Sequence, residues 1–488
     1  MIDLEVKRDR LKRAVKRAKE EGVLLPTFEQ MKNPEKIPES IKENLKDTDL
    51  WEMDSANLFR TTWKNEAVKS GGLYDGVNFI ELPSELTGVD ARIVALVGKW
   101  FPTGAHKVGA TYGCLAPQLV TGKFDPTREK AVWPSTGNYC RGGAYNSELL
   151  GCESIAILPE GMSQERFDWL AGVADEVIST PGSESNIKEI FDKCWELKEE
   201  RDNVRIFNQF DELGNHLWHY EVTGDAMLAA FGELAGAKNL AGMVMTSGSG
   251  GTLASADRVK EEYPLSKLAV GEALQCPTLL YNGYGAHRIE GIGDKHVPWV
   301  HNVRNTDMVM GIDDNDSMSL VRLFNTEVGK EYLEDQGVPV ETIENLDLMG
   351  ISGIANILGA IKMARYYELD EDDVVMTVFT DSMELYESRL EEMMEEAGDY
   401  DEQDAAVDFH RHLRAVGIDH VKELDYYQKK RIHNLKYYTW IEQQGRDVEE
   451  LNAQWYDYEN YWEKLHGMAP EIDELIREFN QRTGLQEE

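Results

Sequence analysis

Short apolar segments alternate with amphipathic segments through the middle of this 488-residue chain. Amphipathic stretches such as SNIKEIFDKCWELKEE are typical of helices, and the short apolar segments are typical of strands. Strands that alternate with helices form βαβ units, so the pattern predicts an α/β fold with a mostly parallel sheet. The segments expected to be strands are ARIVALVG, KAVWPS, SIAILPE, EVIST, VRIFNQF, LAGMVMTS, KLAVGEAL, DMVMGID and DVVMTVFTDS.

The two ends of the chain depart from this alternation. Residues 1–80 are charged and helix-like, and residues 391–488 are acidic, helix-like and rich in Tyr and Trp toward the end. We therefore expect a helical N-terminal extension at 1–80, an α/β core at 81–390 and a helical C-terminal extension without strands at 391–488. The C-terminal aromatic side chains are expected to pack against a partner helix or a second subunit, with ligand binding as the alternative.

The charge of the chain excludes one class of partner. There are 51 Lys and Arg residues against 89 Asp and Glu residues, which gives a formal net charge of −38. Nucleic acids bind to a basic protein face, so no nucleic-acid partner is expected. The acidity is consistent with high solubility or with a high-salt habitat, and it does not identify a substrate.

The cysteines and the hydropathy indicate a compartment. The five cysteines are dispersed and lack a CxxC pair, so we expect reduced thiols, and no metal site is expected. The sequence has neither a signal-peptide core nor a long uncharged apolar segment. We therefore expect a cytoplasmic protein without membrane contact.

A glycine-rich loop, TSGSGGTLAS at 246–255, directly follows the apolar segment LAGMVM. Functional groups of α/β folds gather in loops at the carboxyl ends of strands. Backbone N–H groups of such a loop, at the start of a helix, form an anion site. The alternative is a tight turn that binds nothing, and the loop alone leaves both interpretations open.

Three further loops follow expected strands and carry reactive or polar groups. Lys107 lies in TGAHK, before an apolar helix, where a lysine that loses its proton can form a Schiff base with an aldehyde. The alternative is a surface lysine whose stem covers apolar surface. The loop STGNY at 135–139 offers groups that can clamp a carboxylate, or it forms an ordinary capping turn. Ser382 follows the last strand.

Together and in this order, the four loops resemble those of pyridoxal-phosphate enzymes of the cysteine synthase and cystathionine β-synthase type, which share the tryptophan synthase β fold. The resemblance is collinear over roughly residues 80–390. It implies two open, mostly parallel sheets with flanking helices, and a smaller subdomain at about 112–225. It also implies pyridoxal 5'-phosphate as the cofactor and a homodimer.

The matched motifs assign roles in cofactor binding. The family's TGSxK loop is present as TGAHK, which implies that Lys107 forms the Schiff base with the cofactor and then acts as a general base at Cα. The TSGNT loop is present as STGNY, so Asn138 is implied to bond the cofactor's ring oxygen. Ser382 matches the residue that faces the pyridine nitrogen. The residues implied to hold the phosphate, by the match to GTGGT, are Gly248, Ser249, Gly250, Gly251 and Thr252.

The match is weaker around the substrate. The residues implied to surround it are Ser135, Thr136, Tyr139, Gln209, Gly291 and Asp294. Tyr139 replaces a threonine of the family, Val108 and Gly109 replace an Asp-Arg pair, and Asp294 and Lys295 replace small residues. These departures leave the identity of the substrate open.

The resemblance implies an enzyme that replaces or eliminates a group at Cβ of a small amino acid, through an aminoacrylate. One alternative on the same fold is an amino-acid ammonia-lyase or dehydratase. A second is a thiolase-type β-subunit that works with a small partner subunit. The third is a cofactor-binding subunit without catalytic activity.

Overall fold

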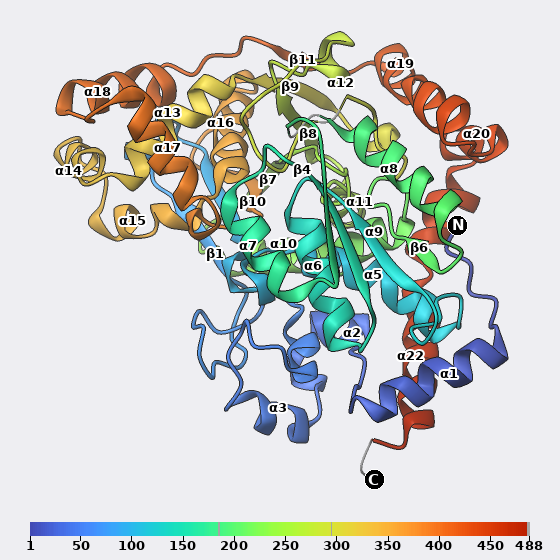
Figure 1. Cartoon of the computed structure of the whole chain (residues 1–488). Coiled ribbons are helices and arrows are strands. Elements are labelled where there is room, and N and C mark those ends of the chain that lie inside the picture. Colours follow the sequence, from blue (N-terminus) through green and yellow to red (C-terminus); the bar gives the residue numbers. More distant parts are fainter. Residues whose placement is uncertain (184–185, 294, 486–488) are drawn as a thin grey trace.

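Two open sheets form the centre of the molecule. The computed structural model describes residues 1–183, 186–293 and 295–485, and its path is shown in Figure 1. Within these residues, a seven-stranded sheet has the order β1-β2-β10-β7-β8-β9-β11, and a four-stranded sheet has the order β5-β4-β3-β6. The larger sheet consists of β1 (Phe79–Leu82), β2 (Arg92–Val97), β7 (Asn239–Thr246), β8 (Lys267–Ala273), β9 (Met308–Ile312), β10 (Asp373–Phe379) and β11 (Val421–Glu423). The smaller consists of β3 (Lys130–Pro134), β4 (Ser154–Pro159), β5 (Glu176–Thr180) and β6 (Val204–Ile206).

The strands are mostly parallel. All pairs of the smaller sheet are parallel, and so are the central pairs of the larger one. The edge strands β1 and β11 are antiparallel to β2 and β9. This arrangement confirms the expected α/β fold with two open, mostly parallel sheets. Every segment that was expected to be a strand forms one.

The structure adds β1 and β11, which the sequence did not predict. The expectation that strands are absent from the C-terminal segment is wrong, because β11 pairs with β9 at Val421 opposite Met310. Both additional strands are short and lie at the edges of the sheet. An edge strand needs no long apolar run, since only one of its sides pairs with a neighbour.

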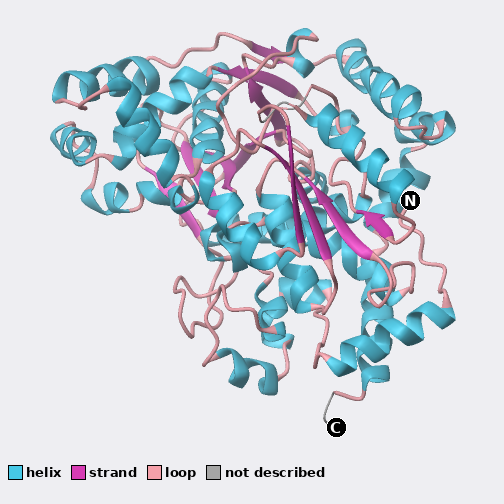
Figure 2. Cartoon of the chain, in the orientation of Figure 1, coloured by secondary structure: helices cyan, strands magenta, loops and turns pink. Residues whose placement is uncertain are grey.

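Helices cover the sheets and extend beyond them (Figure 2). The helices before the second sheet strand are α1 (Arg8–Glu20), α2 (Phe28–Lys32), α3 (Glu39–Leu45) and α4 (Ser84–Thr87). The helices between the strands are α5 (Lys107–Val120), α6 (Asn138–Leu149), α7 (Gln164–Val173), α8 (Ile187–Glu200), α9 (Leu213–Trp218), α10 (Gly224–Glu233), α11 (Ala254–Glu262), α12 (Thr278–Tyr281), α13 (Asp314–Asn325), α14 (Glu327–Asp335), α15 (Val340–Glu344) and α16 (Ile351–Tyr366). The C-terminal helices are α17 (Glu387–Ala397), α18 (Glu402–Val407), α19 (Tyr426–Lys436), α20 (Val448–Tyr456), α21 (Lys464–His466) and α22 (Ala469–Thr483).

The two ends of the chain pack together. In Figure 1 the first helix, α1, lies beside the last, α22. The side chain of Asn480 pairs with the backbone of Leu25, accepting from its N–H at 2.9 Å and donating to its carbonyl at 2.8 Å. Among the C-terminal aromatic residues, Trp440 and Trp462 are buried within the chain, whereas Tyr427 is exposed. Across the described part of the chain, every helix is too short or too polar to cross a lipid bilayer.

Candidate active site

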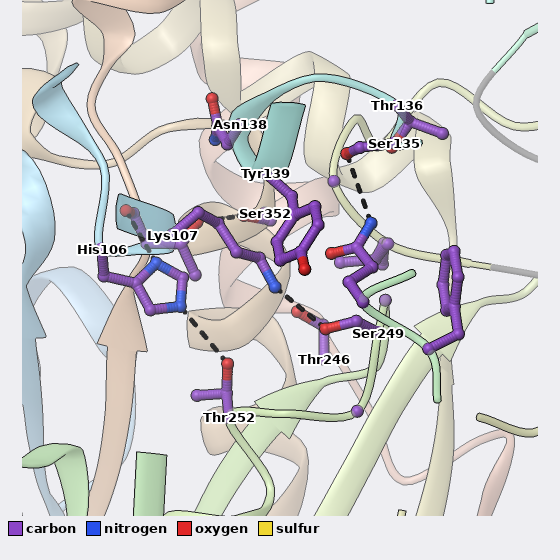
Figure 3. A pocket seen from close by; sticks show the side chains of 17 residues that line it. His106, Lys107, Ser135, Thr136, Asn138, Tyr139, Thr246, Ser249, Thr252 and Ser352 are labelled. Atoms are coloured by element: carbon purple, nitrogen blue, oxygen red, sulfur yellow. Dashed lines mark hydrogen bonds between the residues drawn. The ribbon is translucent and has the colours of Figure 1, made fainter. Parts of the chain in front are cut away.

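A cavity opens where loops from both sheets meet (Figure 3). The loops after β2, β7 and β10 come from the larger sheet, and the loops after β3 and β6 come from the smaller one. The predicted site residues that line the cavity are Lys107, Ser135, Thr136, Asn138, Tyr139, Gln209, Gly248, Ser249, Gly250, Thr252 and Gly291. Residues that are far apart in the sequence therefore share one site, as expected for loops at the carboxyl ends of parallel strands.

Lys107 reaches the glycine-rich loop. It is the first residue of α5, and its Nζ donates to Ser249 Oγ at 3.1 Å. The turn before it has left-handed backbone at Thr103 and Gly104, and a side chain on Gly104 would meet the ring of Trp51 at 2.6 Å. This turn directs the start of α5, and with it the amine, toward the cavity.

His106 connects three of the loops. Its backbone N–H and its Nδ1 both lie within hydrogen-bonding distance of the Thr380 carbonyl, at 3.1 and 3.2 Å. Its Nε2 lies 3.4 Å from Thr252 Oγ1. Complete burial, together with the charge of Lys107, lowers the pKa of His106 to about 3, so the ring is neutral. Because a carbonyl can only accept, Nδ1 carries the proton and Nε2 accepts from the Thr252 hydroxyl.

The glycine-rich loop forms a cradle of backbone N–H groups. Gly250 has a φ of +76°. A Cβ on Gly248 would lie 2.4 Å from the Gly291 carbonyl oxygen, and one on Gly251 would lie 2.1 Å from Asn215 Oδ1. The described residues provide no hydrogen-bond partner for the N–H groups of Gly248, Ser249, Gly250 and Thr252. Since α11 begins at Ala254, these groups and the helix dipole favour an anion.

The STGNY loop faces the cradle across the cavity. Gln209 donates to Ser135 Oγ at 3.2 Å, and Arg166 donates to the Thr136 carbonyl at 2.9 Å. Asn138 donates from Nδ2 to Asp381, which also accepts from Tyr386 at 2.7 Å. Burial raises the pKa of the Asp381 carboxyl.

Two predicted residues lie outside the cavity lining, and the structure does not describe a third. Gly251 packs against Asn215 and does not line the cavity. Ser382 is buried, its Oγ has no partner among the described residues, and it too is absent from the lining. Asp294 lies outside the described residues.

The lining also contains residues to which no role was assigned from the sequence, namely His106, Phe210, Thr246, Ile292, Ser352 and Thr380. His106, Phe210 and Ile292 are direct neighbours of predicted residues in the chain, and Thr246 and Thr380 lie two positions from one. Ser352 is different, since it lies in the first turn of α16 and its Oγ lies 2.9 Å from Thr380 Oγ1. The segment GISGIANILGAIKMA, which contains Ser352, resembles the GISSGAA helix start of the family, although no role was assigned to Ser352 itself.

The site residues fit a phosphorylated pyridine aldehyde. The cradle offers N–H groups without partners, and Lys107 supplies an amine beside it. The buried Asn138 Oδ1 and Ser382 Oγ have no hydrogen-bond partner in the described chain. Such atoms are uncommon in folded proteins and often mark a group that binds there.

Residues 99–381 match the model of the pyridoxal-phosphate dependent enzyme family. The chain belongs to this family. The match covers more than half of the sequence and confirms the resemblance stated above, including the cofactor, pyridoxal 5'-phosphate. Every loop that forms the cavity falls within the matched range.

Curated relatives of this pyridoxal-phosphate enzyme include cysteine synthases and cystathionine β-synthases. A cysteine synthase of Staphylococcus aureus is 31% identical over 286 residues, which is 58% of this chain and 84% of the relative. A cystathionine β-synthase of Saccharomyces cerevisiae is 26% identical over 319 residues, or 63% of this chain and 59% of the relative.

Solved structures share the fold. A hydrogen sulfide-producing enzyme of Fusobacterium nucleatum has a TM-score of 0.54 at 24% identity, and the match covers 71% of this chain and 93% of that one. An O-acetylserine-dependent cystathionine β-synthase of Helicobacter pylori has a TM-score of 0.53 at 24% identity, covering 64% and 94%. At these identities the likeness shows the fold alone.

Proposed function

We propose that this chain catalyses β-replacement or β-elimination on a small amino acid. The observation that carries the proposal is the position of Lys107, whose Nζ lies 3.1 Å from Ser249 of the anion cradle in a cavity that the STGNY loop also lines. When bound, the cofactor supplies an electron sink for the charge that develops at Cα. The names of the relatives support chemistry at Cβ.

Residues on the two sides of the cavity have different proposed roles, proton removal on one side and binding of the substrate carboxylate on the other. On one side, Lys107 is placed to remove the Cα proton as a general base. On the other, the hydroxyls of Ser135 and Thr136 and the amide of Gln209 can donate to the substrate carboxylate. Binding of that carboxylate would fix Cα near Lys107, and such fixed geometry accelerates proton transfer.

The same geometry supports a position for the phosphate and one for the ring. We propose that the N–H groups of the cradle hold the phosphate, with Thr252 oriented by His106. Asn138 has a second amide proton on Nδ2, besides the one directed at Asp381, which can bond a ring oxygen. Ser382 is proposed to face the ring nitrogen, where a hydroxyl adds no negative charge.

A visible spectrum of the protein with pyridoxal 5'-phosphate, compared for wild type and Lys107→Ala, tests the cofactor assignment. We expect the absorption band of the lysine-bound cofactor in wild type and its loss in the variant. A band of equal intensity in Lys107→Ala would contradict the role of Lys107. If the variant retains the cofactor without a covalent bond, its cradle is still folded.

Product analysis tests the reaction. Serine, O-acetylserine and cysteine are supplied in turn, with and without sulfide. A new thioether or thiol product indicates β-replacement, and a keto acid with ammonia indicates elimination, as in a dehydratase or ammonia-lyase. Turnover that requires a second, small chain would favour the thiolase-type β-subunit. The homodimer and the cytoplasmic location remain proposals, which light scattering and fractionation would test.

A further inference from the structure

Two histidines and an aspartate from distant parts of the chain meet in the interior. His216 lies in α9, Asp257 in α11 and His466 in α21. The two Nε2 atoms lie 3.0 Å apart, and Asp257 Oδ2 lies 3.7 Å from His216 Nε2 and 3.6 Å from His466 Nε2. All three side chains are buried, and none lines the cavity.

These distances match the size of a zinc ion. A point equally distant from the three atoms lies about 2.0 Å from each, and zinc takes imidazole nitrogen and carboxylate oxygen at about 2.0 to 2.2 Å. Two imidazoles with one carboxylate are also a ligand set that suits zinc better than magnesium or calcium. Water is the usual fourth ligand where the protein supplies three.

The hydrogen bonds around the cluster aim the ligand atoms inward. His216 Nδ1 lies 2.9 Å from the Val300 carbonyl, which can only accept, so Nδ1 carries the proton and Nε2 presents its lone pair. Asp257 accepts from Asn302 at its ligand atom Oδ2, at 2.8 Å, and from Asn305 at Oδ1. Metal-binding histidines and carboxylates usually have such outer partners, which fix their orientation.

The charge of the cluster is unbalanced without a cation. Among the described residues, no lysine or arginine forms an ion pair with Asp257; the groups within ion-pair distance are the imidazoles of His216 and His466. A buried carboxylate between two neutral rings is costly. A divalent cation would offset this cost and would accept both nitrogen lone pairs, of which a hydrogen bond between the rings uses only one.

We propose that His216, Asp257 and His466 form a buried zinc site. The site would join the C-terminal segment to α11, the helix that follows the glycine-rich loop. It would also brace that loop from a second side, because Asn215, next to His216, donates to Ser249 Oγ at 3.0 Å. The ring of His466 stacks on Tyr220, with 3.9 Å between centroids, which closes one face of the cluster.

Metal content and thermal unfolding test the proposal. The purified full chain is treated with a chelator, dialysed and titrated with ZnCl2, followed by elemental analysis and by its unfolding temperature. We expect uptake of one zinc ion per chain with a higher unfolding temperature. In Asp257→Asn and His466→Ala the zinc affinity should fall at least tenfold, and zinc should no longer raise the unfolding temperature.

His433→Ala is the matched control, since His433 is also a buried histidine of the C-terminal segment but contacts the Leu451 carbonyl instead. It should bind zinc as wild type does. Cobalt in wild type gives a second readout that needs no variant, namely the visible bands of a tetrahedral ion. Absence of zinc uptake in wild type, or uptake by Asp257→Asn equal to that of wild type, would overturn the proposal and leave a hydrogen-bonded triad.

Discussion

Arg166 and Glu290 form a buried ion pair, with 2.6 Å between Nη1 and Oε2. The pair joins two sides of the active site. Arg166 lies in α7 and donates to the Thr136 carbonyl of the STGNY loop, and Glu290 directly precedes Gly291, which lines the cavity. Arg389 also pairs with Glu290 at 2.6 Å, so one carboxylate serves two arginines.

Glu290→Gln tests this connection. Removing one partner of a buried ion pair leaves the other charge uncompensated, which costs about 3 kcal/mol or more. We expect that loss in the free energy of unfolding by urea, together with a higher KM for the amino-acid substrate. Glu474→Gln removes an exposed pair with Arg477 and should change stability by about 0.5 kcal/mol or less. A stability loss with unchanged KM would limit the pair to a role in the fold.

Gly248→Ala tests the anion cradle. The added methyl group would lie 2.4 Å from the Gly291 carbonyl oxygen, which is backbone and can move only with its loop. We expect at least tenfold weaker binding of pyridoxal 5'-phosphate, measured by absorbance titration. Gly232→Ala is the control, because its added Cβ would have no atom of the described residues within 4 Å, and affinity should stay unchanged. Wild-type affinity in Gly248→Ala would contradict the proposed phosphate position.

The sequence predicted much of the fold and of the cavity because both rest on local patterns. A buried parallel strand such as β10 is a continuous apolar run, and the carboxyl ends of such strands bring their loops together. The edge strand β11, with exposed Glu423, has no such run. Lys107 and the glycine-rich loop could therefore be assigned to one site, whereas β11 could not be found.

Long-range pairings were beyond reach of the sequence. His216 and His466 are separated by 250 residues. Neither lies in a motif with metal-ligand spacing, so no local pattern could have revealed the cluster. The domain boundaries remain predictions. So does the role of Ser382, whose neighbour Thr380 lines the cavity in its place.

Ser382→Ala tests whether the Ser382 hydroxyl acts on the cofactor or only contributes to the fold. Its Oγ is buried and has no partner among the described residues, so its removal should leave the stability of the cofactor-free protein unchanged or slightly higher. If Ser382 faces the ring nitrogen, cofactor affinity or turnover should fall about tenfold, the equivalent of one hydrogen bond. Ser317→Ala is matched, since Ser317 Oγ, in α13 outside the cavity lining, is also buried and finds no partner in the described part of the chain. Equal activity in both variants would contradict the role of Ser382.

Asp473 makes the packing of the two chain ends sensitive to pH. It lies in α22 and accepts from the backbone N–H groups of Phe28 and Glu29, at 2.7 and 3.1 Å. Burial raises the pKa of its carboxyl to about 6, against an ordinary value of about 3.9. The folded protein therefore holds this proton more tightly than the unfolded chain does. The resulting stabilisation is complete below the unfolded pKa and is lost as the pH rises through the folded pKa.

Asp473→Asn cannot titrate, so the difference between wild type and variant isolates this effect. From about pH 4 to pH 6, the free energy of unfolding of wild type should fall relative to the variant by about 2 to 3 kcal/mol. Urea unfolding at several pH values measures it, and Glu471→Gln, an exposed carboxylate on the same helix, should show no such trend. If the difference in free energy of unfolding between wild type and Asp473→Asn does not change with pH, the two backbone N–H groups stabilise the carboxylate enough to offset its burial. The contact between α2 and α22 would then be independent of pH.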